Sequence, residues 1–209
     1  MTGHMELLFT CSQVKIDTKV IYNGETALMR ATRRETQDTA LILSKCHDGS
    51  FHETDPQGRT LVSLAAARGY SQLIDLLISE HNADADSKCK YGNTPLSYAA
   101  ETGNVEIVNL LLSKNGVDPD SRDNRGYTPV YWAAYLSQMD VVKELITKYK
   151  VDPDQKNDSG RTLLFHAAEY SRWGVMNFLL NQPSVNPQAK DTLGRTPLFH
   201  AIISRQFSK

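Results

Sequence analysis

The chain has 209 residues, of which 23 are basic and 24 acidic, so its formal net charge is −1. This balance provides no overall positive field for nucleic-acid phosphates, and we therefore expect no nucleic-acid partner. The longest apolar runs, ALIL at 40–43 and LFHAII at 198–203, are far shorter than the roughly 20 residues of a membrane-spanning helix. The sequence therefore predicts no membrane partner.

The N-terminal segment and the cysteines indicate the compartment. MTGHMELLFTC at 1–11 has no basic residue before its apolar stretch, and that stretch is shorter than the core of about 7 to 15 residues in a secretory signal. Cys11, Cys46 and Cys89 form no CxxC pair, and their odd number favours small buried hydrophobes over a disulfide framework. We expect a cytoplasmic protein, with the nucleus left open.

Six glycines stand at one constant spacing. Each lies 34 residues from the next and is followed two residues later by threonine: Gly24, Gly58, Gly92, Gly126, Gly160 and Gly194. The surrounding phrases recur too, for example GNTPLSYAA at 92–100 and GRTLLFHAA at 160–168. Such a period is typical of a solenoid of stacked repeats, none of which folds alone.

The repeats follow one another over the whole chain. In chain order the sequence predicts a partial repeat at 1–22, full repeats at 23–56, 57–90, 91–124, 125–158 and 159–192, and a partial repeat at 193–209. Because the first unit has no first helix and the last has no second helix, we expect a fragment of a longer array. Ser137 and Ser171 replace the glycine between the two helices, so the repeats that contain them should be less regular.

Each repeat is expected to hold two short helices and an extended finger. In the repeat at 91–124, Gly92 suits a tight turn, Thr94 can cap the first helix and Pro95 can begin it. That helix is predicted from Pro95 to about Thr102. The apolar spacing in NVEIVNLLLS at 104–113 predicts the second helix. The polar stretch KNGVDPDSRDNR at 114–125 predicts a hairpin-like finger, because Asp, Asn and Pro favour turns.

At this point the residues resemble a known family. TPLSYAA at 94–100 is similar to the T-P-L-H-x-A-A phrase of ankyrin repeats. The resemblance implies an all-α fold, an ankyrin-repeat solenoid of stacked helix-turn-helix units with hairpin-like fingers. The VDPDS wording of the finger further resembles ankyrin arrays of filamentous fungi, which often form the sensing part of large NTPase receptors. The motif histidine is replaced by Ser97, Tyr131, Phe165 and Phe199, so its usual hydrogen bonds are not expected.

The histidines and aspartates form no recognisable catalytic or metal site. His166 and His200 take equivalent positions in adjacent repeats, so we expect them roughly 10 Å apart, too far to share a zinc ion, and place them in the core. Asp118 and Asp120 begin a stretch that lacks the glycine and closing glutamate of a calcium loop. We expect such aspartate pairs to form turns.

No phosphate-binding glycine motif and no GxSxG elbow appear in the sequence. We therefore expect no catalytic residue, no metal and no cofactor, and the chain is predicted not to be an enzyme.

The resemblance implies that the finger tips and the exposed side of the first helices line one concave groove. Its predicted partner-binding residues are Tyr91, Asn93, Glu101, Thr102, Arg125, Tyr127, Tyr135, Leu136, Arg161, Glu169, Tyr170 and Arg195. The tyrosines are the main candidates, because tyrosine is enriched at interface hot spots. The alternative is that they pack along the finger stems. Tyr98 and Trp132, which precede the alanine pairs, are predicted to pack in the core.

The predicted function is non-catalytic binding of a protein or peptide in this groove, centred on residues 91–170. The alternative is a ligand-sensing regulatory segment of a larger NTPase receptor or signalling protein, which the incomplete end units favour.

Overall fold

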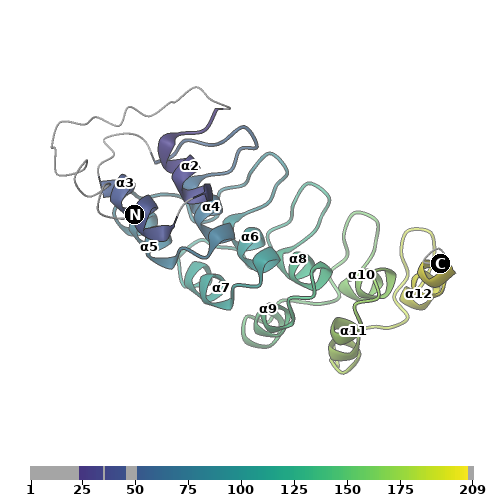
Figure 1. Cartoon of the computed structure of the whole chain (residues 1–209). Coiled ribbons are helices and arrows are strands. Elements are labelled where there is room, and N and C mark those ends of the chain that lie inside the picture. Colours follow the sequence, from purple (N-terminus) through teal and green to yellow (C-terminus); the bar gives the residue numbers. More distant parts are fainter. Residues whose placement is uncertain (1–23, 35, 46–50, 207–209) are drawn as a thin grey trace.

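The computed structural model describes residues 24–34, 36–45 and 51–206. Short helices follow one another in pairs and lie in two rows, as Figure 1 shows. The first helices α2, α4, α6, α8, α10 and α12 form one row, and the second helices α3, α5, α7, α9 and α11 form the other. The expected partial repeat at 1–22 lies outside the described residues, as do Cys11 and Cys46.

The helices are short and regularly placed. Their bounds are α2 (Ala27–Arg34), α3 (Gln37–Lys45), α4 (Leu61–Arg68), α5 (Ser71–Ser79), α6 (Pro95–Thr102), α7 (Val105–Leu112), α8 (Pro129–Tyr135), α9 (Met139–Lys143), η1 (Glu144–Lys148), α10 (Leu163–Glu169), α11 (Trp173–Leu180) and α12 (Pro197–Gln206). The π-helical turn η1 continues α9 directly. Over the described residues, the only β-structure is an isolated bridge between Thr54 and Thr60. The expected all-α solenoid of helix pairs is confirmed.

The start of α6 follows the prediction. Thr94 is the N-cap, its hydroxyl accepts a hydrogen bond from the Ser97 N–H at 3.3 Å, and Pro95 begins the helix. The equivalent threonines before α8 and α10, Thr128 and Thr162, make no such bond. There the N–H of Tyr131 donates to the Thr128 backbone carbonyl at 3.0 Å instead. The threonine cap occurs in α2, where Met29 stands three residues later, and in α4 and α6, where serine does, but not in α8 and α10, where an aromatic residue does.

The turn between the helices of a pair requires a left-handed backbone. Gly103 adopts φ 77° after α6. At the equivalent positions Ser137 and Ser171 adopt φ 62° and 54°, and the helices before them, α8 and α10, have 7 residues against 8 in α6. The expected irregularity of these two pairs is therefore present, and two side chains occupy a conformation that favours glycine.

We expect Ser137→Gly and Ser171→Gly each to raise the free energy of unfolding. A side chain in the left-handed region costs roughly 1 to 2 kcal/mol, which the greater freedom of glycine in the unfolded chain partly offsets, leaving a gain of about 0.5 to 1 kcal/mol. Urea unfolding followed by circular dichroism measures it. Ser113→Gly is the control, because Ser113 has φ −78° and glycine there should destabilise. A lower free energy of unfolding in Ser137→Gly would show that the serine backbone is not strained at this position.

The predicted aspartate turns are confirmed in the fingers. The N–H of Asp120 donates to Asp118 Oδ1 at 2.9 Å. The same bond at 2.9 Å joins Asp86 to Asp84 and Asp154 to Asp152. These carboxylates therefore shape the loop between each second helix and the following finger tip.

The core lies between the two rows of helices. Leu73, Ile74 and Leu77 of α5 are fully buried, and so are the small residues Ala99 and Ala100 of α6. Because alanine side chains are short, α4 and α6 can approach closely along this row. The core residues include Cys89, as predicted, together with His166 and His200.

Candidate partner-binding surface

The residues predicted to contact a partner lie on the finger tips and at the ends of the first helices, and we call this set of residues the groove face. It comprises finger residues 91–93, 125–127, 159–161 and 193–195 and helix ends 101–102, 135–136 and 169–170. In Figure 1 the loops project on one side of the row of α6, α8 and α10, whereas α7, α9 and α11 lie on the opposite side. Every residue predicted to contact a partner belongs to the groove face.

A side-chain turn at the base holds the tip of four of the described fingers, whereas the finger of Gly92 has Cys89 at the equivalent position. Asp123 Oδ1 accepts hydrogen bonds from the backbone N–H groups of Arg125 at 2.8 Å and Tyr127 at 2.9 Å. Asp55, Asn157 and Asp191 make the equivalent pairs of bonds. The sequence analysis missed this motif, although an aspartate or asparagine three residues before the repeated glycine is its signal.

The finger tips are also bonded to one another. The N–H of Asn124 donates to the Tyr91 carbonyl at 3.0 Å, and the Asn124 side-chain amide donates to the Lys90 carbonyl at 2.8 Å. Lys88, Arg122 and Lys156 each donate to a backbone carbonyl 34 residues further along. The tips therefore form a bonded row rather than independent loops.

The predicted residues differ in exposure. Tyr91 is 62%, Tyr170 42% and Leu136 40% exposed, and Thr102 and Arg125 are exposed as well. The others are partly buried: Asn93, Glu101, Tyr127, Tyr135, Arg161, Glu169 and Arg195. Among the predicted residues, the exposed tyrosine and leucine side chains are therefore Tyr91 and those at the C-terminal ends of α8 and α10. Three leucines that were not predicted are more exposed than Leu136, namely Leu180 at 53%, Leu193 at 71% and Leu198 at 67%.

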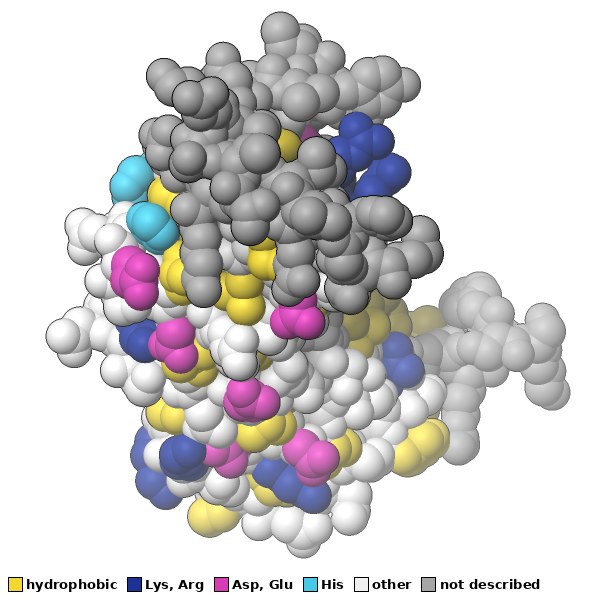
Figure 2. Space-filling view, turned by 60° about the vertical axis from the view of Figure 1, so that its left-hand side comes forward, with side chains coloured by type: hydrophobic (Ala, Val, Ile, Leu, Met, Phe, Trp, Pro, Cys, Tyr) yellow, Lys and Arg dark blue, Asp and Glu magenta, His cyan; other side chains and the backbone are white. Residues whose placement is uncertain are grey.

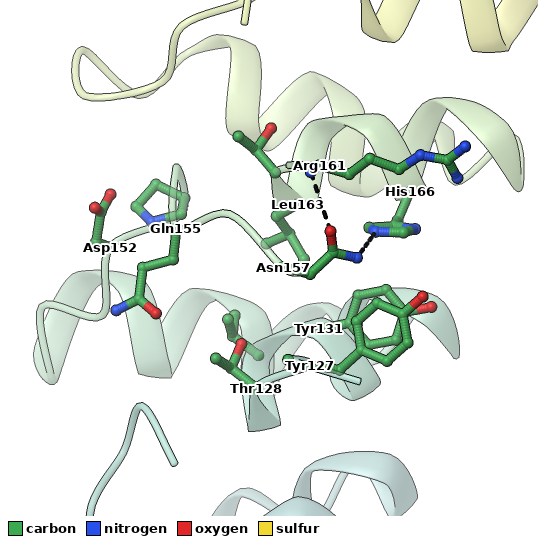
Figure 3. Close-up of a pocket in the computed structure, with 13 residues that line it drawn as sticks. Tyr127, Thr128, Tyr131, Asp152, Gln155, Asn157, Arg161, Leu163 and His166 are labelled. Atoms are coloured by element: carbon green, nitrogen blue, oxygen red, sulfur yellow. Dashed lines mark hydrogen bonds between the residues drawn. The ribbon is translucent and has the colours of Figure 1, made fainter. Parts of the chain in front are cut away.

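Tyr127 does not point outward as expected. Its ring stacks on that of Tyr131 with centroids 3.8 Å apart and an interplanar angle of 6°, and it meets the edge of His166 at 5.4 Å. Figure 3 shows the two tyrosine rings lying flat against each other below His166. Tyr131 stands where the family motif has histidine, and its large buried ring gives Tyr127 a surface to pack on. For Tyr127 these contacts agree with the alternative that its ring packs within the array.

Aromatic contacts continue from there across the surface. Tyr135 packs on Tyr131 at 6.1 Å, and the ring of Tyr170 meets Tyr135 at 4.8 Å and 88°. We call Tyr127, Tyr131, Tyr135 and Tyr170 the aromatic strip. The Arg172 guanidinium lies over the Tyr135 ring at 5.7 Å. The strip thus joins the α8 and α10 pairs and becomes more exposed toward Tyr170.

The residues predicted for the core lie beside this strip. Trp132 is partly buried and packs against the core cluster, as predicted. Tyr98 is only half-buried, and its hydroxyl donates to the Cys89 sulfur at 3.5 Å. Burial, followed by that hydrogen bond, raises the pKa of Tyr98 above its ordinary value.

Two arginines of the groove face, Arg161 and Arg195, are paired within the array. Arg161 contacts Glu169 at 3.1 Å, and Arg195 contacts Asp191 through Nε at 2.9 Å and through its terminal nitrogen at 2.8 Å. Burial raises the pKa of Asp191, but hydrogen bonds from Arg195 and His200 lower it by more, so the pKa lies below its ordinary value. Arg161 therefore ties its finger to the end of α10, and Arg195 closes the base of its own finger.

The surroundings of His166 favour its neutral form. Asn157 Oδ1 accepts two backbone N–H bonds, so the Asn157 amide nitrogen faces His166 Nε2 at 3.2 Å and donates to it. The ring proton is then on Nδ1. Burial first, and then the charge of Arg161, lower the pKa of His166 from 6.5 to about 4. Figure 3 shows Asn157 linking His166 to the backbone of Arg161.

A small cavity lies beneath the strip, between the α8 helix start and the next finger. It is lined by residues that include Tyr131, Asp152, Thr162 and His166, and its free volume is about 20 Å³. That volume suits a single water molecule rather than a cofactor. The hydroxyl of Thr162 is buried there with no hydrogen-bond partner. The cavity therefore provides a hydration site, not a ligand pocket.

The described residues contain no group of three or more His, Cys, Asp or Glu side chains placed to hold a metal ion. Among the helices described here, none is long and apolar enough to cross a membrane. In the view of Figure 2, acidic and basic side chains are interspersed with hydrophobic ones over the exposed surface.

These features define a class of protein: a solenoid repeat protein whose short helix pairs are joined by bonded finger loops. The family model for ankyrin repeats (3 copies) matches residues 41–123, 62–157, 112–191 and 130–208. These matches cover well over half of the chain, which therefore belongs to the ankyrin repeat family. Ankyrin repeats are generally protein–protein interaction modules and are typically non-catalytic. No curated protein matches the sequence, so nothing supports the resemblance to fungal arrays.

Proposed function

We propose that the chain is a non-catalytic interaction module that binds a protein or peptide on its groove face, centred on residues 91–170. The observation that carries the proposal is the exposed end of the aromatic strip, where Tyr170 and Leu136 lie open to solvent beside Tyr135. Nucleic acid, membranes and cofactors are not among the partners that we propose. We place this function in the cytoplasm, with the nucleus left open.

The physical properties of this surface favour a protein partner. Tyrosine offers a large contact area with a polar end, and truncating such an anchor in an interface costs about 2 kcal/mol or more. The bonded finger row and the edge-to-face contact between Tyr135 and Tyr170 hold the surface in place before binding. A pre-organised surface loses little conformational entropy when a partner docks.

We expect the triple variant Tyr91→Ser, Leu136→Ser, Tyr170→Ser to bind its partner at least about tenfold more weakly, because it removes exposed anchors. Tyr127 is left intact, since its stacking on Tyr131 supports the fold. The partner is first captured with the unmodified chain and identified by mass spectrometry. Affinity is then measured by calorimetry, and far-UV circular dichroism checks that the variant stays helical.

A matched pair of single substitutions separates the two faces. Leu136→Ser changes the groove face, and Leu180→Ser makes the same change at the end of α11 in the other row, where Leu180 is 53% exposed. We expect weaker binding from the first and unchanged binding from the second. The opposite result would move the interface to the second helices. No feature of the described residues favours the alternative of a ligand-sensing segment in a larger receptor.

A further inference from the structure

Two helix pairs carry an ion pair between the finger and the end of the first helix. Arg161 follows the finger glycine and contacts Glu169, eight residues later, at 3.1 Å. Glu25 and Arg33 take the same two positions near α2 and form an ion pair with the charges reversed. The position after the glycine and the position eight residues later are therefore in contact across the groove face.

The helix pair midway between them lacks this ion pair. Asn93 and Glu101 occupy the same two positions, 68 residues before Arg161 and Glu169. Asn93 Oδ1 is buried without a hydrogen-bond partner. The Glu101 carboxylate has no ion-pair or hydrogen-bond partner among the residues that the structure describes. The α10 pair thus has a donor, Arg161, facing an acceptor, Glu169. At the equivalent positions the α6 pair has two acceptors, Asn93 Oδ1 and the Glu101 carboxylate.

The side chain of Glu101 is also partly shielded from water. Glu101 is partly buried, and desolvation raises the pKa of its carboxyl above the ordinary value. A desolvated carboxylate without a cation is unfavourable, and a charge-assisted hydrogen bond relieves this cost. The chain itself supplies no such cation in the described residues, so a donor from outside is the complementary group.

The neighbouring helix pair carries aromatic rings at the positions equivalent to these acceptors. One period further along, the equivalents of Asn93 and Glu101 are Tyr127 and Tyr135, both members of the aromatic strip. Tyr135 already has the guanidinium of Arg172 over its ring at 5.7 Å. A carboxylate and an aromatic face together suit an arginine or lysine side chain. The carboxylate pairs with the positive charge, and the aromatic face packs against the apolar stem and attracts the cation.

We propose that Glu101 binds an arginine or lysine side chain of the partner, in the place that the Arg161 guanidinium occupies two periods later. This proposal rests on the proposed function and specifies the partner: a protein segment that presents a basic side chain next to residues packing on the aromatic strip. Arginine fits best, since its planar fork can donate two parallel hydrogen bonds to the Glu101 carboxylate.

The test selects peptides from a displayed library of random peptides of about 12 residues, long enough to cross neighbouring repeats, with the complete chain as bait. We expect arginine or lysine at one fixed position. The affinity of one selected peptide, with a dye attached, is then measured by fluorescence anisotropy. Glu101→Gln should weaken binding at least about tenfold, by loss of a desolvated charge pair. Asn93→Arg should also weaken binding at least about tenfold. The introduced guanidinium would pair with Glu101, as Arg161 pairs with Glu169, and so occupy the proposed site.

A control and a coupling measurement make the test specific. Glu106→Gln removes an exposed carboxylate from α7, in the other row, and should leave the affinity unchanged. Replacing the peptide's basic residue by glutamine should weaken binding to the unmodified chain but add little when Glu101→Gln is already present. Selected peptides without a basic residue, or full affinity in Glu101→Gln or Asn93→Arg, would overturn the proposal.

The outcomes also separate this proposal from the one on which it rests. If selected peptides lose affinity for Leu136→Ser but not for Glu101→Gln, the groove face binds peptides and only the basic-residue site is wrong. If no peptide is selected, or if none responds to Leu136→Ser, the groove face itself is not the binding surface and both proposals fail.

Discussion

Gly92→Ala is expected to lower the free energy of unfolding by about 3 kcal/mol, through backbone strain and overpacking combined. Gly92 has φ +83°, and an added Cβ would lie 2.7 Å from the backbone nitrogen of Asn124 and 2.8 Å from Asp123 Cα. Backbone atoms cannot turn aside as a flexible side chain can. The finger would have to separate from its neighbour and weaken the bond between Asn124 and the Tyr91 carbonyl.

Gly116→Ala is the matched control for this prediction. Gly116 has φ +86°, but an added Cβ there meets nothing within 4 Å. Its cost is therefore backbone strain alone, roughly 1 to 2 kcal/mol. Urea unfolding of both variants gives the difference, which measures the close packing of one finger on the next. Equal losses in the two variants would show that finger contact does not require glycine.

The second large effect is a loss of stability on mild acidification that depends on His166. Its pKa is about 4 in the folded chain against 6.5 ordinarily. Between these values the unfolded chain binds a proton that the folded chain does not, so stability falls as the pH falls. The loss approaches about 1.4 kcal/mol per pH unit, or about 2 kcal/mol between pH 7 and pH 5.

His166→Tyr isolates this contribution, because Tyr98 stands at the equivalent position of α6 and shows that the fold accommodates tyrosine there. The free energy of unfolding should fall more steeply with decreasing pH in the unmodified chain than in the variant. Carboxyl groups titrate in both proteins, so their effect is common to the two curves. An NMR titration of His166 in the folded chain gives its pKa directly, and a value near 6.5 would contradict the prediction.

Local rules account for the parts of the fold that the sequence predicted correctly. The start of α6 at Pro95 and the aspartate turns depend on neighbouring residues alone. The missing caps at Thr128 and Thr162 and the inward stacking of Tyr127 depend instead on the bulky residues that replace the motif histidine. Those effects arise from packing, which a residue's place in the repeat does not reveal.

The candidate site was predictable to a similar extent. Position in the repeat predicted the exposure of Tyr91, Leu136 and Tyr170. It did not predict that Arg161 is paired with Glu169, nor that Glu101 lacks a cation in the described chain. The pairing of Arg161 and the lack of a cation at Glu101 both depend on side-chain contacts across the groove face. These contacts are found only by comparing the equivalent positions of several helix pairs in the structure.

Photo-crosslinking of the captured partner tests the location of the interface most directly. The photoreactive residue p-benzoylphenylalanine replaces Leu136 on the groove face in one variant and Leu180 at the end of α11 in another. Both positions are exposed, so the two probes are equally accessible in the free chain. Crosslinking from position 136 but not from position 180 is the predicted result. Crosslinking from position 180 alone would place the partner on the second helices and contradict the groove face as the binding surface.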